Sequence, residues 1–338
     1  MNRNGICVAG NMIVDILYPV KGLPKPGELT SIEEGISRTT GGALCNVIGD
    51  LSLMDPGLDL TALGRVGTDG EGAYILETLK GYKNLDLSMI KLEGKTSFTA
   101  VMADQITKER TFFHYRGANA KFCEDDINWD KIKAKFLHVG YVLLLDALDT
   151  EDNEYGTKMA RLLCQAQKRG IKTSVDVVSE MGDRFKRLVP PALKYTDYCI
   201  INEIEAGQVT GITLRDEAGK LLTPNILPAL QEIKKLGVSQ WAVIHCPEGG
   251  YGLDDTGRFV ESPSIKLPAD YIKGTVGAGD AFCAGALYSA YHGESLKEAL
   301  ELGNAAAAAS LSKPGAVEGM LSVENLKNLR RLLGGTKS

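Results

Sequence analysis

Short apolar segments alternate with amphipathic helical segments between residues 136 and 246. Four stretches are short apolar runs that are typical of buried strands: 136–139, 171–178, 198–201 and 241–244. Helices are predicted from apolar spacing and from flanking glycine or proline at 43–53, 154–169, 226–236, 279–291, 295–312 and 323–333. This alternation predicts an open, largely parallel α/β sheet with helices on both faces. In such a sheet, functional side chains are expected at the carboxyl ends of the strands.

Two stretches, 16–40 and 96–118, do not fit the alternating pattern. The first contains three prolines, and the second holds alternating runs at 96–102 and 110–115 around a polar turn. We expect these two separated stretches to form one small antiparallel β element. Inserted in an α/β domain, such an element is typically a lid or a dimer surface. The whole chain, 1–338, is therefore predicted to be one domain that carries an inserted lid.

Composition and charge exclude several classes of protein. The chain has 338 residues and a formal net charge of −5, without the concentrated basic surface that nucleic-acid binding needs. No apolar run approaches the roughly 20 residues that cross a bilayer, so no membrane partner is expected. Seven cysteines form no CxxC pair, which favours reduced thiols. The first residues enter an apolar strand without a signal-peptide pattern, so we expect a cytoplasmic protein.

The segment 274–280, Gly-Thr-Val-Gly-Ala-Gly-Asp, runs directly into a predicted helix. A glycine-rich turn at a helix N-terminus presents unpaired backbone N–H groups to an anion. Asp280, in the first turn of that helix, would repel the anion unless it has another task, and proton abstraction from an attacking hydroxyl is such a task. In the alternative interpretation the glycines form an ordinary turn and Asp280 compensates the helix dipole.

This heptapeptide resembles the second signature of the PfkB (ribokinase-like) family of sugar and nucleoside kinases, Asp-Thr-x-Gly-Ala-Gly-Asp, with Gly274 in place of the first Asp. Further segments are similar to family motifs and follow the family's order: 10–15, 41–46, 64–72, 202–205, 249–252 and 314–316. The chain is therefore identified as a member of this family. The resemblance implies a three-layer α/β/α fold with a small β lid.

The resemblance also implies roles for residues at the reacting centre. Asp280 would be the general base, and the backbone N–H groups of Gly277, Ala278 and Gly279 would form the anion hole. Four further residues would bind the sugar acceptor: Asp15, Gly41, Gly42 and Asn46. From its own position, Asp15 is expected at the carboxyl end of the first strand, where a carboxylate can accept hydrogen bonds from two vicinal hydroxyls. An Asx turn before Pro19 is the alternative.

The nucleotide side of the site is expected to bind ATP and Mg²⁺. Asn202 and Glu205 share one face of a helical turn after a strand and are suited to hold Mg²⁺ through water. The resemblance adds four further ATP-binding positions: Thr275, Gly249, Gly250 and Gly252. Asn304 is another candidate, because the small side chains that follow it leave room for a flat base. Hairpin chemistry explains the three glycines equally well, and tight helix packing explains the small residues after Asn304. Asp176 is expected near the triphosphate at the end of another strand.

The sequence predicts an ATP-dependent kinase that phosphorylates a hydroxyl of a small sugar. A nucleoside kinase is the first alternative, because Phe112, Phe113 and Tyr115 could stack on a base. A phosphosugar kinase would need cations at the acceptor, for which the candidates on the lid side are Arg110, Arg116 and Lys121. A non-catalytic sugar sensor is a further alternative. Gly274 puts potassium activation in doubt, because many family members use an Asp there in a monovalent-cation site. A homodimer through the lid strands is a further expectation.

Overall fold

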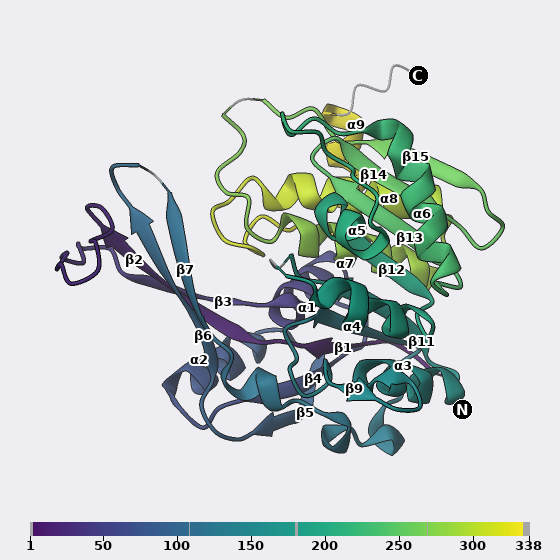
Figure 1. The fold of residues 1–338 in the computed structure, drawn as a ribbon, viewed down its shortest axis with the longest axis horizontal. Helices are drawn as coiled ribbons and strands as arrows, with labels where there is room; N and C mark the ends of the chain where they lie inside the picture. Colours follow the sequence, from purple (N-terminus) through teal and green to yellow (C-terminus); the bar gives the residue numbers. More distant parts are fainter. Residues whose placement is uncertain (1–2, 108, 180–181, 269, 334–338) are drawn as a thin grey trace.

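A nine-stranded sheet forms the centre of the protein in a computed structural model, which describes residues 3–107, 109–179, 182–268 and 270–333 (Figure 1). The strand order is β15 (Phe259–Pro263), β14 (Gly249–Leu253), β13 (Trp241–Cys246), β12 (Tyr198–Asn202), β11 (Lys172–Val177), β8 (Phe136–Val142), β1 (Ile6–Gly10), β4 (Leu60–Val66) and β5 (Leu85–Leu92). Neighbouring strands from β13 to β5 are parallel, and β14 and β15 add two antiparallel pairings at one edge. The predicted, largely parallel sheet is confirmed.

Helices cover both faces of this sheet because its central strands are apolar on both sides. In β1, Cys7 and Ala9 pack into one buried cluster, while Ile6 and Val8 pack into another. The first cluster includes α3 (Lys158–Lys168), α4 (Arg184–Leu193), α5 (Glu203–Thr210) and α6 (Ile226–Lys235). The second includes α1 (Ala43–Met54), α2 (Gly70–Leu79), α7 (Ala278–His292), α8 (Leu296–Ser310) and α9 (Val323–Leu333). These layers confirm the predicted three-layer α/β/α fold.

A separate four-stranded sheet, called the lid sheet below, projects from this body (Figure 1). Its strand order is β3 (Ser37–Gly41), β2 (Ile13–Val20), β6 (Ser97–Asp104) and β7 (Arg110–Tyr115). The two predicted segments do combine, but the expectation of a purely antiparallel element is wrong, since β2 and β6 are parallel. They follow β1 and β5, which run in the same direction in the central sheet. Residue 108, within the predicted lid, lies outside the described residues.

The predicted helix 154–169 begins later than expected. Residues 151–157 instead form a small hairpin of β9 (Glu151–Asp152) and β10 (Gly156–Thr157). The Thr157 hydroxyl accepts a hydrogen bond from the Ala160 N–H and caps α3, so the helix starts at Lys158. Short 3₁₀ turns complete the structure: η1 (Gly117–Lys121), η2 (Glu124–Asp126), η3 (Trp129–Lys131) and η4 (Thr223–Asn225). Among the described residues, no helix has both the length and the apolar character that a membrane crossing requires.

Candidate active site

The first turn of α7 lies beside the loop at 314–316. Gly277, the N-cap residue, has a φ of 80°, and a Cβ added to it would lie 2.6 Å from the Cβ of Ala316. Only glycine combines this left-handed backbone with so close an approach. The first-turn N–H groups of an α-helix have no acceptor within the helix, so those at 278 and 279 are available to an anion. Both residues line a cavity of about 270 Å³ together with Asp280.

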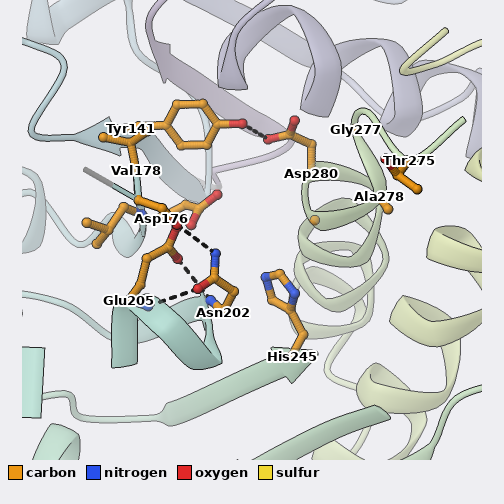
Figure 2. Close-up of a pocket in the computed structure, with 13 residues that line it drawn as sticks. Tyr141, Asp176, Val178, Asn202, Glu205, His245, Thr275, Gly277, Ala278 and Asp280 are labelled. Carbon is orange, nitrogen blue, oxygen red and sulfur yellow. Dashed lines mark hydrogen bonds between the residues drawn. The ribbon is translucent and has the colours of Figure 1, made fainter. Parts of the chain in front are cut away.

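Two side chains from distant elements hold the Asp280 carboxylate. The Tyr141 hydroxyl donates to Oδ1 at 2.7 Å (Figure 2). The Asn46 amide donates to Oδ2 at 2.8 Å. Burial raises the pKa of Asp280, whereas the hydrogen bonds from Tyr141 and Asn46 lower it. These two hydrogen bonds therefore fix the orientation of the Asp280 carboxylate. Its oxygens keep lone pairs that can accept a hydrogen bond from a ligand hydroxyl.

The cavity beside α7 concentrates negative charge. Asp176, Glu205 and Asp280 all line it. Burial, with the charges of Glu205 and Asp280, raises the pKa of Asp176 well above its usual range. Burial likewise raises the pKa of Glu205 to about 7, against hydrogen bonds from Asn202 and Ser179 that lower it. A divalent cation would relieve this repulsion, and it would also offset the negative charge of a bound phosphate chain.

Asn202 and Glu205 form the capping box of α5. The Asn202 side chain accepts from the Glu205 N–H at 2.9 Å, and Glu205 accepts from the Asn202 N–H at 2.9 Å. Ser179 donates to Glu205 at 2.8 Å. Within the described residues, no group of three or more His, Cys, Asp or Glu side chains is arranged to hold a metal ion directly. Residues already engaged in this way fit Mg²⁺ held through its own water molecules, since this ion dehydrates reluctantly.

A second and larger cavity, of about 620 Å³, adjoins the first. Thr275, Asn304 and several apolar side chains, including Ile265, Ile272 and Leu311, line it. The Asn304 amide nitrogen donates to the Ser262 carbonyl at 2.9 Å and to its hydroxyl at 3.1 Å, so the side-chain oxygen of Asn304 remains available. A mostly apolar cavity with a few polar groups is suited to a flat heterocycle.

The three predicted nucleotide-side glycines lie elsewhere. Gly249, Gly250 and Gly252 belong to β14, and none is among the residues that line the described cavities. A Cβ on Gly250 would meet Phe282 at 2.8 Å, and one on Gly252 would meet Leu296 at 2.9 Å. The packing of β14 against α7 and α8 is therefore sufficient to explain these two glycines, and their nucleotide role stays a prediction.

A third cavity, of about 360 Å³, lies between the lid sheet and the body, and Asp15, Gly41 and Asn46 line it. Asp15 lies inside β2 of the lid sheet, not at the end of the first central strand, because a turn after Gly10 leads directly into β2. Burial raises the pKa of Asp15, and a hydrogen bond from Thr99 lowers it. The buried Asn46 Oδ1 has no partner among the described residues, so it can accept a ligand hydroxyl.

The glycine pair 41–42 shapes the entry to this third cavity. Any Cβ on Gly41 would collide with Oδ2 of Asp15. Gly42 caps α1 with a φ of 87°, and a Cβ there would lie 2.5 Å from the Asn11 carbonyl oxygen. Gly42 is not among the residues that line the cavity. Its place in the fold therefore supports a backbone role, which brings Asn46 of α1 to the cavity wall.

Sequence patterns do not single out Tyr141 and His245, although both residues line the 270 Å³ cavity beside α7 together with Asp280. Tyr141 lies near the end of β8, and His245 lies near the end of β13. Inspection of the residues that follow the predicted strands 136–139 and 241–244 would have found both, because parallel strands deliver such residues to one edge.

Gly274 is also explained by packing. A Cβ at this position would lie 2.8 Å from the Pro314 carbonyl oxygen and 3.0 Å from the Lys313 carbonyl oxygen. An aspartate there would require the 313–314 backbone to move. The close contact between the backbone at Gly274 and the backbone of 313–314 therefore explains why this chain has glycine where the family pattern has aspartate.

Comparisons with known proteins agree with this geometry. The model of the pfkB family carbohydrate kinases matches residues 3–322. Ribokinase of Arabidopsis thaliana is 26% identical over 317 residues, which cover 93% of this chain and 78% of the relative. The 2-dehydro-3-deoxygluconokinase of Escherichia coli K12 is 24% identical over 270 residues, covering 75% of this chain and 80% of the relative.

The fold has solved counterparts as well. The structure of Arabidopsis thaliana ribokinase complexed with ribose and ATP aligns with a TM-score of 0.79 at 22% identity, covering 97% of this chain and 98% of that one. Since the family model spans nearly the whole chain, the chain belongs to the pfkB family of carbohydrate kinases, phosphotransferases with an alcohol group as acceptor.

Proposed function

We propose that the protein, as one domain, transfers the γ-phosphoryl group of ATP to a hydroxyl of a small neutral carbohydrate. The observation that carries this proposal is the Asn46–Asp280 hydrogen bond of 2.8 Å. Asn46 lines the cavity under the lid sheet, while Asp280 lines the cavity beside the α7 N-terminus. A base at the meeting point of an acceptor cavity and an anion site has the position that phosphoryl transfer needs.

The proposed chemistry uses the chain's own groups in three roles. Asp15 and Asn46 orient the acceptor, whose reactive hydroxyl gives its proton to Asp280. The backbone N–H groups of the Gly277–Gly279 turn hold the charge that develops on the transferring phosphoryl group. Mg²⁺, held through water near Asn202 and Glu205, would supply neutralisation of the phosphate charge. The larger cavity, with Thr275 and Asn304, takes the nucleoside of ATP.

The charges of the acceptor cavity favour a neutral sugar. Asp15 and Glu318 contribute two carboxylates, and Arg110 contributes one cation. Arg116 is occupied by the Leu143 carbonyl at 3.0 Å and by Asp146 at 3.3 Å, and Lys121 is not among the residues that line the cavity. A phosphate group on the acceptor would therefore lie beside two carboxylates and only one cationic side chain in this cavity.

A nucleoside acceptor is the second candidate. Phe112 lines the acceptor cavity with 64% of its surface exposed, so it is free to stack on a base. Phe113 alternates to the opposite face of the strand and does not support this candidate.

The test is a coupled assay of ADP release with ATP and Mg²⁺ against neutral ketoses and aldoses, nucleosides and sugar phosphates. We expect turnover with a neutral sugar, and Asp280→Asn should lower it by roughly 10²- to 10⁴-fold, the range for a lost general base. Turnover with a nucleoside alone would establish the second candidate. Turnover that survives in Asp280→Asn would contradict the role of the base.

The same assay tests potassium dependence. Gly274 offers no carboxylate and packs against the backbone of 313–314. We expect equal turnover in potassium and in sodium salts. Stimulation by potassium alone would show that other groups build a monovalent-cation site.

A further inference from the structure

A fourth cavity, called the side cavity below, adjoins the acceptor cavity under the lid sheet. It measures about 250 Å³ and lies between β3, α1, α2 and the loop that follows α8. The two cavities share five lining residues: Thr39, Thr40, Gly315, Ala316 and Glu318. A ligand of the acceptor cavity that reaches between β3 and the loop at 315–318 therefore enters the side cavity.

The open edge of β3 gives the side cavity a polar wall. β3 is the edge strand of the lid sheet, so one row of its backbone N–H and C=O groups has no strand partner. The Tyr74 hydroxyl of α2 donates to the Arg38 carbonyl at 3.1 Å, which indicates that this row faces α2. Thr39 and Thr40 follow on the same strand and point to its two faces, because neighbouring side chains alternate. In the described part of the chain, their hydroxyl groups have no hydrogen-bond partner.

Aromatic rings and hydroxyl groups form the opposite wall of the side cavity. Tyr74 and Thr78 come from α2, and Tyr82 follows shortly after that helix. Burial, with the charge of Asp50, raises the pKa of Tyr82, so its phenol stays protonated and can donate. The Tyr82 hydroxyl has no partner among the described residues. Such a mixture of rings and free hydroxyl groups is suited to an uncharged ring that carries hydroxyls.

Glu318 lines both cavities and is the only charged side chain among the described residues that line the side cavity. Its carboxyl group lies over Gly315, since a Cβ added to that glycine would be 2.7 Å from the Glu318 Cδ atom. The Arg38 guanidinium stacks on the Tyr74 ring, 4.3 Å from its centroid, and is not among the lining residues. A carboxylate accepts hydrogen bonds from hydroxyls and repels anions. The side cavity therefore favours a neutral, hydroxyl-bearing group.

We propose that the side cavity binds the second sugar ring of a neutral disaccharide, whose first ring lies in the acceptor cavity and presents its reactive hydroxyl to Asp280. This inference rests on the proposed function and names its substrate class, because it needs a sugar acceptor under the lid sheet. The second ring packs against Tyr74 and Tyr82, and Glu318 accepts hydrogen bonds from hydroxyls near the link between the two rings. A crevice that holds only water is the competing explanation.

The test compares monosaccharides with disaccharides that contain them, in the coupled assay of ADP release with ATP and Mg²⁺. The pairs are glucose with maltose and cellobiose, galactose with lactose, and fructose with lactulose. Leu53→Trp narrows the side cavity, and Leu53 is 41% exposed, so α1 can accommodate the larger side chain. Tyr82→Phe keeps the ring and removes one hydroxyl. Leu332→Trp is the matched control, because Leu332 is an exposed leucine of α9 that lines neither cavity.

We expect one disaccharide to exceed its monosaccharide in kcat/KM by about 10- to 100-fold, the gain from roughly two uncharged hydrogen bonds. Leu53→Trp should remove this gain and leave the monosaccharide unchanged. Tyr82→Phe should lower the disaccharide value about 2- to 10-fold, the range for one such bond, and Leu332→Trp should change neither sugar.

Three results would overturn the side-cavity subsite alone. They are a disaccharide gain that survives Leu53→Trp, equal losses for both sugars in that variant, and monosaccharides that react as well as every disaccharide. Absence of turnover with every sugar would overturn the proposed function and this inference with it.

Discussion

Tyr141 and Asp280 come from opposite parts of the chain, yet they share a 2.7 Å hydrogen bond at the centre of the site. A phenol that donates to a carboxylate stabilises its charged form. Other ionisable groups that interact with Asp280 are Asp50, Asp176, Cys45 and Cys283. None of them supplies a positive charge. Tyr141 is therefore a main reason why Asp280 can remain ionised in a buried, acidic setting.

Replacement of Tyr141 by Phe removes this donor and keeps the ring. The pKa of Asp280 then rises, so a larger fraction of the base is protonated at low pH. We expect the acid limb of the kcat/KM profile to move up by roughly one pH unit, since about 1.4 kcal/mol corresponds to one unit of pKa. Tyr155→Phe, a change at an exposed Tyr155–Lys168 pair, is the control. An unmoved acid limb would argue that Tyr141 only fills space.

Asp50 is a second buried acid, one helical turn after Asn46 on α1. It is fully buried, and neither carboxylate oxygen has a partner among the described residues. Burial, with the charge of Asp280, raises the pKa of Asp50 well above its usual 3.8. The folded chain therefore holds Asp50 protonated, whereas the unfolded chain releases that proton above pH 3.8.

This difference gives the stability of the protein a definite pH dependence. Because the folded state binds more protons, the contribution of Asp50 to the free energy of unfolding falls as pH rises from 3.8 toward the folded pKa. The slope is at most about 1.4 kcal/mol per pH unit. We expect Asp50→Asn to gain stability relative to the unaltered chain as pH increases. Urea unfolding of both proteins from acid to neutral pH measures this, and a constant difference would show that Asp50 does not titrate on unfolding.

Individual residues differ in how far the sequence could predict them. Asp280 and the Gly277–Gly279 turn form one contiguous motif, whose chemistry follows from a helix N-terminus. Tyr141 and Asp50 gain their roles only from neighbours far away in sequence. No local pattern distinguishes Asp50 from an ordinary polar residue on a helix, because its burial depends on how α1 packs against α7.

At the scale of elements, α7 has a left-handed glycine at each end. Gly277 has a φ of 80° at the N-terminus, and Gly293 has a φ of 73° at the C-terminus. Their surroundings differ, because a Cβ on Gly277 would lie 2.6 Å from that of Ala316, whereas nothing lies within 4 Å of a Cβ on Gly293. Alanine at either position would have the same unfavourable left-handed backbone. Only at Gly277 would its methyl group also collide with a neighbouring residue.

This pair allows a matched test of the anion hole. Alanine at either position should cost about 1 kcal/mol of stability, since non-glycine residues disfavour this backbone region. Only Gly277→Ala should also move the first turn of α7, lowering turnover by about 10²-fold, as a displacement of roughly 1 Å can do. Steady-state kinetics and thermal unfolding of both variants measure this. Equal turnover in the two variants would contradict the need for close packing at Gly277.

The elements show where sequence patterns suffice and where they do not. The parallel strands and most helices follow from apolar periodicity, because the sheet buries both of its faces. Apolar periodicity predicts the start of α3 four residues too early, because the β9–β10 hairpin and its contact with Pro191 leave no periodic signal. The glycines of β14 resemble a ligand-binding turn in sequence, but they accommodate Phe282 and Leu296.

At the scale of the whole molecule, the lid sheet has two faces of different character. Asp15, Val101 and Phe112 point to the acceptor cavity. Since side chains alternate along a strand, Phe113 and Tyr115 lie on the opposite face, where they are 58% and 44% exposed. Tyr115 also packs against Phe98, with ring centroids 5.4 Å apart. An exposed aromatic face on a thin sheet is typical of an interaction surface.

We predict that a second copy of the chain covers this face. Size-exclusion chromatography with light scattering should give twice the 36.4 kDa mass of one chain. Phe113→Asp should return the mass to one chain, because a buried unpaired charge is costly at an interface. Leu332→Asp is the matched control, since Leu332 is an exposed apolar residue on α9, 81% accessible. A single-chain mass for the unaltered protein, or a dimer that survives Phe113→Asp, would show that no second copy covers this face of the lid sheet.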